Sequence, residues 1–206
     1  MRSAGIVLAA GASTRMGRPK QLLPVEGRPL LQLVVERACA SRLDEVYVVL
    51  GARAEEIRAR VEMGRARVVV NPEYASGMAS SLRAGLDALG AEVERAVVIL
   101  GDQPGVTGEQ IDRLLELHQR SGLPAAALSF DGLLHPPVVL GRELWPGLAS
   151  LEGDVGCRAL IRARPEQVAA LPVPAVHRHP VDVDTPHDYE RLTGGAPMEH
   201  PGEARG

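Results

Sequence analysis

Residues 4–20, AGIVLAAGASTRMGRPK, carry the pattern that decides the fold of this chain. An apolar run over 6–10 leads into a loop with two glycines and three basic residues, Arg15, Arg18 and Lys20. A buried strand followed by such a loop offers backbone N–H groups and positive charge, which together suit the phosphates of a nucleotide. The spacing matches neither GxxxxGK[ST] nor GxGxxG, so a solvated surface loop is the alternative from composition alone.

The composition is that of one globular domain. The chain has 206 residues, of which only 2% are aromatic, so we expect a sizeable aliphatic core. A net charge of -3 and few aromatic rings argue against a nucleic-acid partner. Cys39 and Cys157 form no CxxC pair, which disfavours a disulfide framework and favours a reducing, cytoplasmic location. No apolar run is long enough to cross a bilayer, so no membrane partner is expected.

Strand and helix patterns alternate along most of the chain. Continuous apolar runs, each followed by helical spacing, occur at 6–10, 46–50, 68–70 and 96–100. They predict an α/β fold, a Rossmann-like, doubly wound, mostly parallel sheet whose strands, the third included, are buried between helices on both faces. We expect one domain over 1–192 and a disordered tail over 193–206, where Gly and Pro are frequent and periodicity is lost.

Capping residues predict several helix boundaries. Thr107 with Gln110 three residues later indicates a capping box at a helix start. Thr185 followed by Pro186 predicts the start of the last helix, because Pro suits the first helical position. Ser76 is expected to be the N-cap of an earlier helix.

The carboxyl ends of the strands are where a doubly wound sheet binds ligands. This rule directs attention to the loop after Ala10, the segment after Val70, and Asp102, which follows Leu100. An ionised Asp102 would be costly inside the core, whereas at the sheet edge a hard cation would stabilise it. The alternative is a turn aspartate that bonds local N–H groups.

Two further segments offer polar groups. In PVDVDTP, residues 180–186, Asp182 and Asp184 share one face of an expected late strand, and one of them could complete a site with Asp102. The alternative is that they only favour the N-terminus of the next helix. In ASGMASSL, residues 75–82, small residues at a helix start would leave N–H groups free for an anion or a base edge.

The loop sequence LAAGASTRMGRPKQLL, residues 8–23, resembles the nucleotidyltransferase pattern LAAGxSxRMGxxKxLL. Further motifs recur in the same order: NPEYASGMASSL, LGDQP, a His-Pro pair at His135, GDVGCR and DVDTPHDY. Over about 5–192 the chain is therefore similar to the molybdenum-cofactor nucleotidyltransferases, and to their cytidylyltransferase branch in particular. The resemblance implies a Rossmann-like fold on which a nucleoside triphosphate and Mg²⁺ meet a phosphorylated acceptor. CTP is favoured, with GTP possible, and the acceptor is a molybdopterin-type cofactor.

The resemblance also implies roles for individual residues. Catalysis falls to Arg15, Lys20 and Asp102, and the metal ligands are Asp102 and Asp184. Nucleotide contacts are implied for Leu8, Ala9, Ala10, Gly11, Ser13, Arg15, Lys20, Asn71, Gly77, Met78 and Ser81. The acceptor is implied to meet His135, Asp154 and Arg158, with Asp154 at a helix N-cap. Whether Asp182 also reaches the metal is left open, and Leu134 stands where the family has a glycine before its His-Pro pair.

The resulting hypothesis is in-line attack of an acceptor phosphate on the α-phosphorus, with Arg15 and Lys20 countering charge on the departing pyrophosphate. A molybdenum hydroxylase or its chaperone would receive the product. The alternatives are a sugar-phosphate or isoprenoid-phosphate acceptor, a non-catalytic nucleotide-binding module, and an NAD(P)-dependent oxidoreductase on the same fold. The missing GxGxxG disfavours the last of these.

Overall fold

The structure of the protein, a computed structural model, describes residues 1–173 and 182–194, without the side chains of Arg15 and Leu160. Within these residues seven strands form one sheet in the order β5-β4-β1-β6-β8-β7-β9. The strands are β1 (Ser3–Leu8), β4 (Glu45–Leu50), β5 (Arg67–Val70), β6 (Arg95–Leu100), β7 (Ala125–Phe130), β8 (Leu133–Gly141) and β9 (Val168–Pro172). A separate hairpin pairs β2 (Pro24–Val25) with β3 (Arg28–Pro29).

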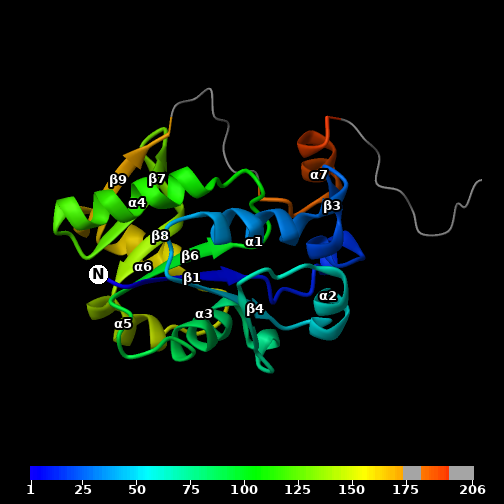
Figure 1. The fold of residues 1–206 in the computed structure, drawn as a ribbon, viewed down its shortest axis with the longest axis horizontal. Helices are drawn as coiled ribbons and strands as arrows, with labels where there is room; N and C mark the ends of the chain where they lie inside the picture. Colours follow the sequence, from blue (N-terminus) through cyan, green and yellow to red (C-terminus); the bar gives the residue numbers. More distant parts are fainter. Residues whose placement is uncertain (174–181, 195–206) are drawn as a thin grey trace, which may run out of the picture.

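Helices cover both faces of this sheet, which confirms the predicted doubly wound architecture (Figure 1). The helices are α1 (Leu30–Ala40), α2 (Ala54–Arg60), α3 (Met78–Asp87), α4 (Gly108–Ser121), α5 (Trp145–Ala149), α6 (Cys157–Ala163) and α7 (Pro186–Leu192). α1 and α4 bury their apolar side chains against one face, while α3, α5 and α6 pack on the other. The two resulting cores are almost entirely aliphatic, as expected from the composition.

The sheet is mostly parallel, again as predicted, with β8 as its antiparallel strand. β1 pairs in parallel with β4 and β6, and β7 with β9, whereas β8 runs against both β6 and β7. The reversal follows from the turn between β7 and β8, where Asp131 and Gly132 both have positive φ, 49° and 78°. Two such residues form the tight turn that joins antiparallel strands.

The third predicted strand differs from expectation. β5 exists, but it is an edge strand paired with β4, and Val70 is 48% exposed. The expectation that this strand is buried was wrong, because an apolar run of three residues cannot show whether the strand has neighbours on both sides. The central strands β1 and β6, in contrast, are buried along their whole length.

The predicted helix starts agree in two cases out of three. Thr107 and Thr185 both form complete capping boxes, the second with Asp188. Ser76 is not an N-cap: its hydroxyl donates to the carbonyl of Glu73 (2.7 Å) within a 3-10 turn, and Gly77 is the N-cap of α3, which begins at Met78.

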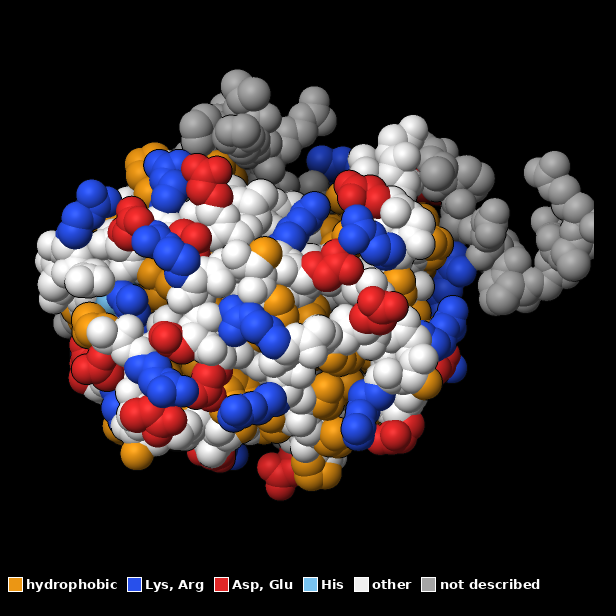
Figure 2. Space-filling view, in the orientation of Figure 1, with side chains coloured by type: hydrophobic (Ala, Val, Ile, Leu, Met, Phe, Trp, Pro, Cys, Tyr) orange, Lys and Arg blue, Asp and Glu red, His pale blue; other side chains and the backbone are white. Residues whose placement is uncertain are grey.

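The C-terminal part is described only from 182 to 194. The expected tail lies outside the described residues from 195 onward, and so does the part of the expected late strand before 182. Residues 182–184 themselves are not in a strand; they lead directly into α7. On the face drawn in Figure 2, acidic and basic side chains are interspersed. None of the helices in the described part of the chain is long and apolar enough to span a membrane.

Candidate functional site

A cleft of about 600 Å³ opens at the carboxyl ends of β1 and β6. It is lined by five segments that are far apart in the sequence: the glycine loop (residues 9–20) with Gln21, the start of α3 with the turn before it, the end of β6, the pair Asp154 and Arg158, and the pair Asp182 and Asp184. Most residues that the sequence nominated line it, namely Leu8, Ala9, Ala10, Gly11, Ser13, Lys20, Gly77, Met78, Ser81, Asp102, Asp154, Arg158 and Asp184. The cleft lies where the strand-end rule predicts a ligand site.

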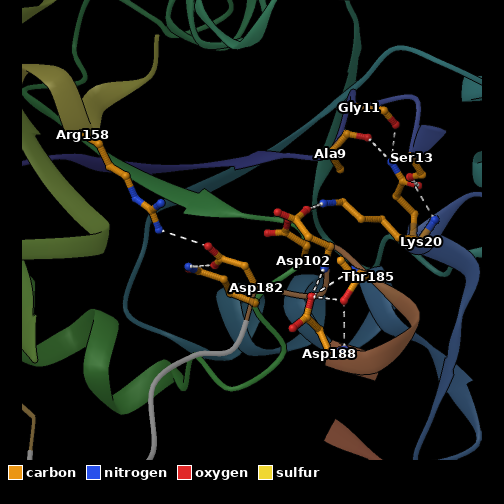
Figure 3. Close-up of polar contacts among 12 residues, drawn as sticks. Ala9, Gly11, Ser13, Lys20, Asp102, Arg158, Asp182, Thr185 and Asp188 are labelled. Atoms are coloured by element: carbon orange, nitrogen blue, oxygen red, sulfur yellow. Dashed lines mark hydrogen bonds and ion pairs between the residues drawn. The ribbon is translucent and has the colours of Figure 1, made fainter. Parts of the chain in front are cut away.

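Lys20 joins the two carboxylates that the sequence nominated for a metal. Its Nζ donates to Asp102 Oδ2 (2.5 Å) and to Asp184 Oδ1 (2.8 Å), as Figure 3 shows for Lys20 and Asp102. Asp102 lies two residues after the end of β6, and Asp184 lies directly before Thr185, the N-cap of α7. The side chains of Lys20 and Asp102 are only 18% and 15% exposed, so this ion pair is largely shielded from solvent.

Burial and charge act against each other in this cluster. Burial alone would lower the pKa of the Lys20 ammonium, but the carboxylates of Asp102 and Asp184 outweigh it and the pKa is raised. Burial raises the pKa of Asp102 despite the opposing effect of Lys20, and the charges of Asp182 and Asp184 raise it further. The lysine therefore stays charged, and the cluster favours a second cation whenever both of its carboxylates are ionised.

The carboxylate pair fits the Mg²⁺ that the sequence implies. Asp102 Oδ1 is buried and finds no hydrogen-bond partner in the part of the chain that the structure describes. Such an oxygen is costly unless a donor or a cation meets it. Over 1–173 and 182–194 no three His, Cys, Asp or Glu side chains gather to hold a metal, so Asp102 and Asp184 would supply two ligands and leave the others to phosphate or water. That ligand set is typical of Mg²⁺.

The glycine loop presents N–H groups to the cleft. All four carbonyl groups of residues 8–11 accept hydrogen bonds from within the protein, two from backbone N–H groups and two from the side-chain amide of Gln21. The N–H groups of Gly11 and Ala12 have no acceptor among the described residues, and both residues are exposed. Carbonyls turned inward and N–H groups turned outward suit an anion such as phosphate.

The start of α3 differs from this arrangement. Its N–H groups were expected to be free, but Met78 N donates to Asp154 Oδ1 (3.2 Å) and Ala79 N to the carbonyl of Gly153 (3.1 Å). Asp154 is likewise not the N-cap of its own following helix, since α6 begins only at Cys157. Both expectations were wrong for one reason: the segment around Asp154 folds back and caps α3, a long-range contact that helix spacing cannot reveal.

Asp182 links the end of β6 to α6 across the cleft. It accepts from Gln103 Nε2 (2.5 Å) and from Arg158 Nη2 (3.2 Å), and Figure 3 shows Arg158 reaching it from the opposite wall. Both of its oxygens are thus engaged. In this arrangement Asp182 holds the side chains of Gln103 and Arg158 in place.

Three nominated residues are not brought to the cleft in this way. Asn71 is 3% exposed, and its Nδ2 donates to the hydroxyls of Ser80 (2.8 Å) and Ser81 (3.1 Å), so it holds Ser81 at the cleft and does not line it. His135 lies on β8, away from the cleft lining, with its ring against the edge of Phe130. The side chain of Arg15 lies outside the described structure.

The sequence reasoning missed several residues at the site. Tyr74 and Gln21 line the cleft, as do Ala12, Thr14, Met16, Ala75, Leu100 and Gly101. Gln21 and Gln103 are buried amides (2% and 1% exposed) that bond cleft residues. A signal existed for the two glutamines, because each is a polar residue next to a nominated charge, Lys20 or Asp102, in an otherwise apolar stretch.

Comparisons with known proteins agree with this geometry. Residues 5–169 match the family model of the MobA-like NTP transferase domain. The chain is 39% identical over 170 residues to nicotine blue oxidoreductase of Paenarthrobacter nicotinovorans, covering 78% of this chain and 82% of that protein. It is 31% identical over 198 residues to the purine catabolism protein PucB of Bacillus subtilis, covering 91% and 94%.

A solved structure is similar over nearly the whole chain. The crystal structure of Rv0371C from Mycobacterium tuberculosis in complex with manganese superposes with a TM-score of 0.80 at 29% identity, covering 95% of this chain and 100% of that one. Fold, cleft and family model therefore point the same way, and the chain belongs to the MobA-like NTP transferase family.

Proposed function

We propose that the chain transfers a nucleotidyl group from a nucleoside triphosphate, CTP in preference to GTP, to a phosphorylated acceptor of the molybdopterin type, with release of pyrophosphate. One observation carries the proposal: a lysine held between two carboxylates, Lys20 with Asp102 and Asp184, lies in the same cleft as a loop whose N–H groups at Gly11 and Ala12 meet no acceptor in the described part of the chain. Phosphoryl transfer uses these three parts, backbone donors for the phosphates, a lysine and ligands for a metal.

In the proposed reaction an oxygen of the acceptor phosphate forms a bond to the α-phosphorus. The bond from the α-phosphorus to the bridging oxygen breaks, and pyrophosphate leaves with the electron pair. Mg²⁺ held by Asp102 and Asp184 would neutralise phosphate charge when bound. The loop N–H groups at Gly11 and Ala12 bind the triphosphate and orient it for in-line attack, and Lys20 offsets the negative charge that grows on the leaving group.

The acceptor side of the cleft supports a ligand with a flat ring system. Tyr74, Met78 and Val155 are among the large apolar side chains that stay exposed, at 37%, 38% and 39%. Tyr74 and Met78 line the cleft, and Val155 follows Asp154, which also lines it. Arg158 supplies a cation for an acceptor phosphate at this end. An apolar rim beside an arginine suits a phosphorylated ring better than a sugar phosphate, which would call for more hydrogen-bonding groups.

The remaining parts of the proposal follow from the family resemblance. We infer a cytoplasmic enzyme that uses Mg²⁺ and hands its product to a molybdenum hydroxylase or its chaperone. The preference for CTP rests on the further motifs NPEYASGMASSL, LGDQP, GDVGCR and DVDTPHDY, whose order resembles that of the cytidylyltransferase branch.

Pyrophosphate release tests the reaction directly. The pure protein is incubated with CTP, GTP or ATP, Mg²⁺ and each acceptor class: molybdopterin-type cofactor, a sugar phosphate, an isoprenoid phosphate. Lys20→Met and Asp102→Asn should each lower the rate about a hundredfold or more, because the first removes a positive charge beside the reacting phosphates and the second removes a charged ligand of the metal that would neutralise them. Glu116→Gln, an exposed charge change on α4 outside the cleft, should behave as wild type. Unchanged release in either cleft variant would refute the mechanism, and nucleotide binding without any product would indicate a non-catalytic module.

A second candidate is favoured by one observation, the relative named nicotine blue oxidoreductase at 39% identity. Under this reading the same cleft would bind a nicotinamide cofactor and reduce or oxidise a ring substrate. NADH or NADPH consumption in the presence of a coloured aromatic substrate, without pyrophosphate formation, would establish it. The loop after β1 has no GxGxxG pattern for a dinucleotide, which is why we place this candidate second.

A further inference from the structure

Gln21 is a buried side chain beneath the glycine loop. It is 2% exposed, and its Nε2 donates two hydrogen bonds, to the carbonyls of Ala9 (2.9 Å) and Gly11 (3.0 Å). These are the contacts drawn beside Ala9 and Gly11 in Figure 3. A primary amide has two N–H donors, so both are used on the loop.

The other end of the same amide reaches the lysine turn. Gln21 Oε1 accepts from the hydroxyl of Ser13 (3.3 Å), and that hydroxyl accepts from the backbone N–H of Lys20 (3.1 Å). Ser13 has φ 54° and ψ 37°, a left-handed conformation that a residue other than glycine adopts at a cost of about 1 kcal/mol or more. The chain of contacts from Gln21 through Ser13 helps to hold that conformation.

The bonds to Ala9 and Gly11 determine which way the loop peptides face. A carbonyl oxygen that pointed into the cleft would repel a phosphate, whereas the N–H on the opposite side of the same peptide unit attracts it. Of the four carbonyls at 8–11, two are held by neighbouring backbone, and Gln21 alone holds the other two. Without these bonds nothing in the described residues would keep those two carbonyls turned inward.

We propose that Gln21 is a positioning residue that fixes the anion-binding form of the glycine loop. It acts through the loop: its bond to the carbonyl of Gly11 turns that peptide unit so that the N–H of Ala12 faces a polyphosphate, and its bond to the carbonyl of Ala9 fixes the unit before it. The unit that carries the Gly11 N–H is held between them, where the carbonyl of Ala10 accepts from Ala52. This inference rests on the proposed function in one respect, that the ligand of the loop is a phosphate chain.

The test compares two buried glutamines. Gln21→Met keeps the volume of the side chain and removes its hydrogen bonds. Gln32→Met is the matched control, because Gln32 is also buried (7% exposed) but lies on α1, outside the cleft, where it bonds Glu36. Binding of CTP with Mg²⁺ and of tripolyphosphate alone is measured by calorimetry, with thermal melting of each variant alongside.

We expect Gln21→Met to bind both probes at least about tenfold more weakly, because the loop loses the hydrogen bonds that orient its peptide units before the ligand binds. Gln32→Met should bind both probes as tightly as wild type, even if its melting temperature falls as far as that of Gln21→Met. A Gln21→Met protein that binds both probes as tightly as Gln32→Met would overturn the inference and leave the proposed function standing. Wild-type protein that binds neither probe would overturn both.

Gln21→Glu supplies an independent readout that does not depend on stability. A carboxylate of the same shape cannot donate to the carbonyls of Ala9 and Gly11, whereas a protonated carboxyl group can donate to one of them. Affinity of this variant for tripolyphosphate, divided by that of wild type at the same pH, should therefore rise as pH falls. Dividing by the wild-type affinity removes the pH dependence that comes from Lys20, Asp102 and Asp184, which line the same cleft in both proteins. A ratio independent of pH would contradict a role through these hydrogen bonds.

Discussion

Replacing Lys20 by Met should destabilise the protein and make its stability depend on a divalent cation. The lysine is the partner of two carboxylates, and its removal leaves Asp102, 15% exposed, without its ion pair. Removing one partner of a fully buried pair costs about 3–5 kcal/mol. Asp184 is 38% exposed, so solvent screens that half of the interaction, and we expect a loss of about 2 kcal/mol.

The assay is thermal unfolding at constant ionic strength, with and without millimolar Mg²⁺ or Mn²⁺. For a chain of this length about 2 kcal/mol corresponds to a melting temperature roughly 4–8 °C below wild type. A cation bound between the two carboxylates would replace the lysine charge, and binding at a hundredfold excess over Kd returns about 2.7 kcal/mol. The variant should therefore gain more from the cation than wild type, in which Lys20 competes for the same oxygens.

The double variant Lys20→Met with Asp102→Asn is the control. It no longer buries an unpaired charge, so it should melt above the single variant without cation and respond little when cation is added. Equal melting of Lys20→Met and wild type in cation-free buffer would refute the idea that the lysine stabilises these carboxylates. An equal gain from cation in both proteins would refute competition between Lys20 and the metal.

Three further variants test other contacts of the site. Asp188→Asn should lower the free energy of unfolding in urea by about 1 kcal/mol, because it weakens the capping box of α7. The Thr185 hydroxyl and nearby N–H groups lower the pKa of Asp188 in the folded protein, so its ionised form stabilises the protein fully above the unfolded pKa of about 3.9. The stability difference between wild type and variant should therefore shrink as the pH falls through the lower pKa of the folded state. Gly77→Ala should lower stability by about 2 kcal/mol or more, since φ is 111° and a Cβ would lie 2.3 Å from the opposing glycine carbonyl; a variant as stable as wild type would show that the two segments separate easily. Asp182→Asn should raise the KM for the acceptor and leave that for CTP nearly unchanged, because the carboxylate no longer holds the Arg158 guanidinium in position; equal changes in both constants would contradict this.

The parts of the site that could be predicted are those encoded in short stretches of sequence. The glycine loop, Lys20, and an aspartate at the end of an apolar strand are local features, and the strand-end rule is enough to bring them to one cleft. The capping box at Thr107 was predicted for the same reason, because cap and partner are three residues apart, and the N-cap at Thr185 was predicted from the proline beside it.

The parts that could not be predicted depend on contacts between distant segments. Nothing in the spacing of residues 71–82 shows that Asp154 would cap α3, or that Asp182 would engage Arg158. The edge position of β5 depends on the sheet order, which apolar runs do not reveal. His135 was nominated from a motif, and the β7–β8 hairpin that carries it contributes no residue to the cleft lining.

Because Asp154 caps α3, the two ends of the cleft differ in how much positive charge they offer to a ligand. A free helix N-terminus attracts anions, but here that positive end is already neutralised by a carboxylate, and Arg158 close by is paired with Asp182. The glycine loop at the other end keeps N–H groups exposed. A substrate with phosphates at one end and a neutral base at the other therefore meets a cleft whose two ends differ in charge. We expect its phosphates to enter first and to bind at the glycine loop, so that its orientation is fixed before its base makes any contact.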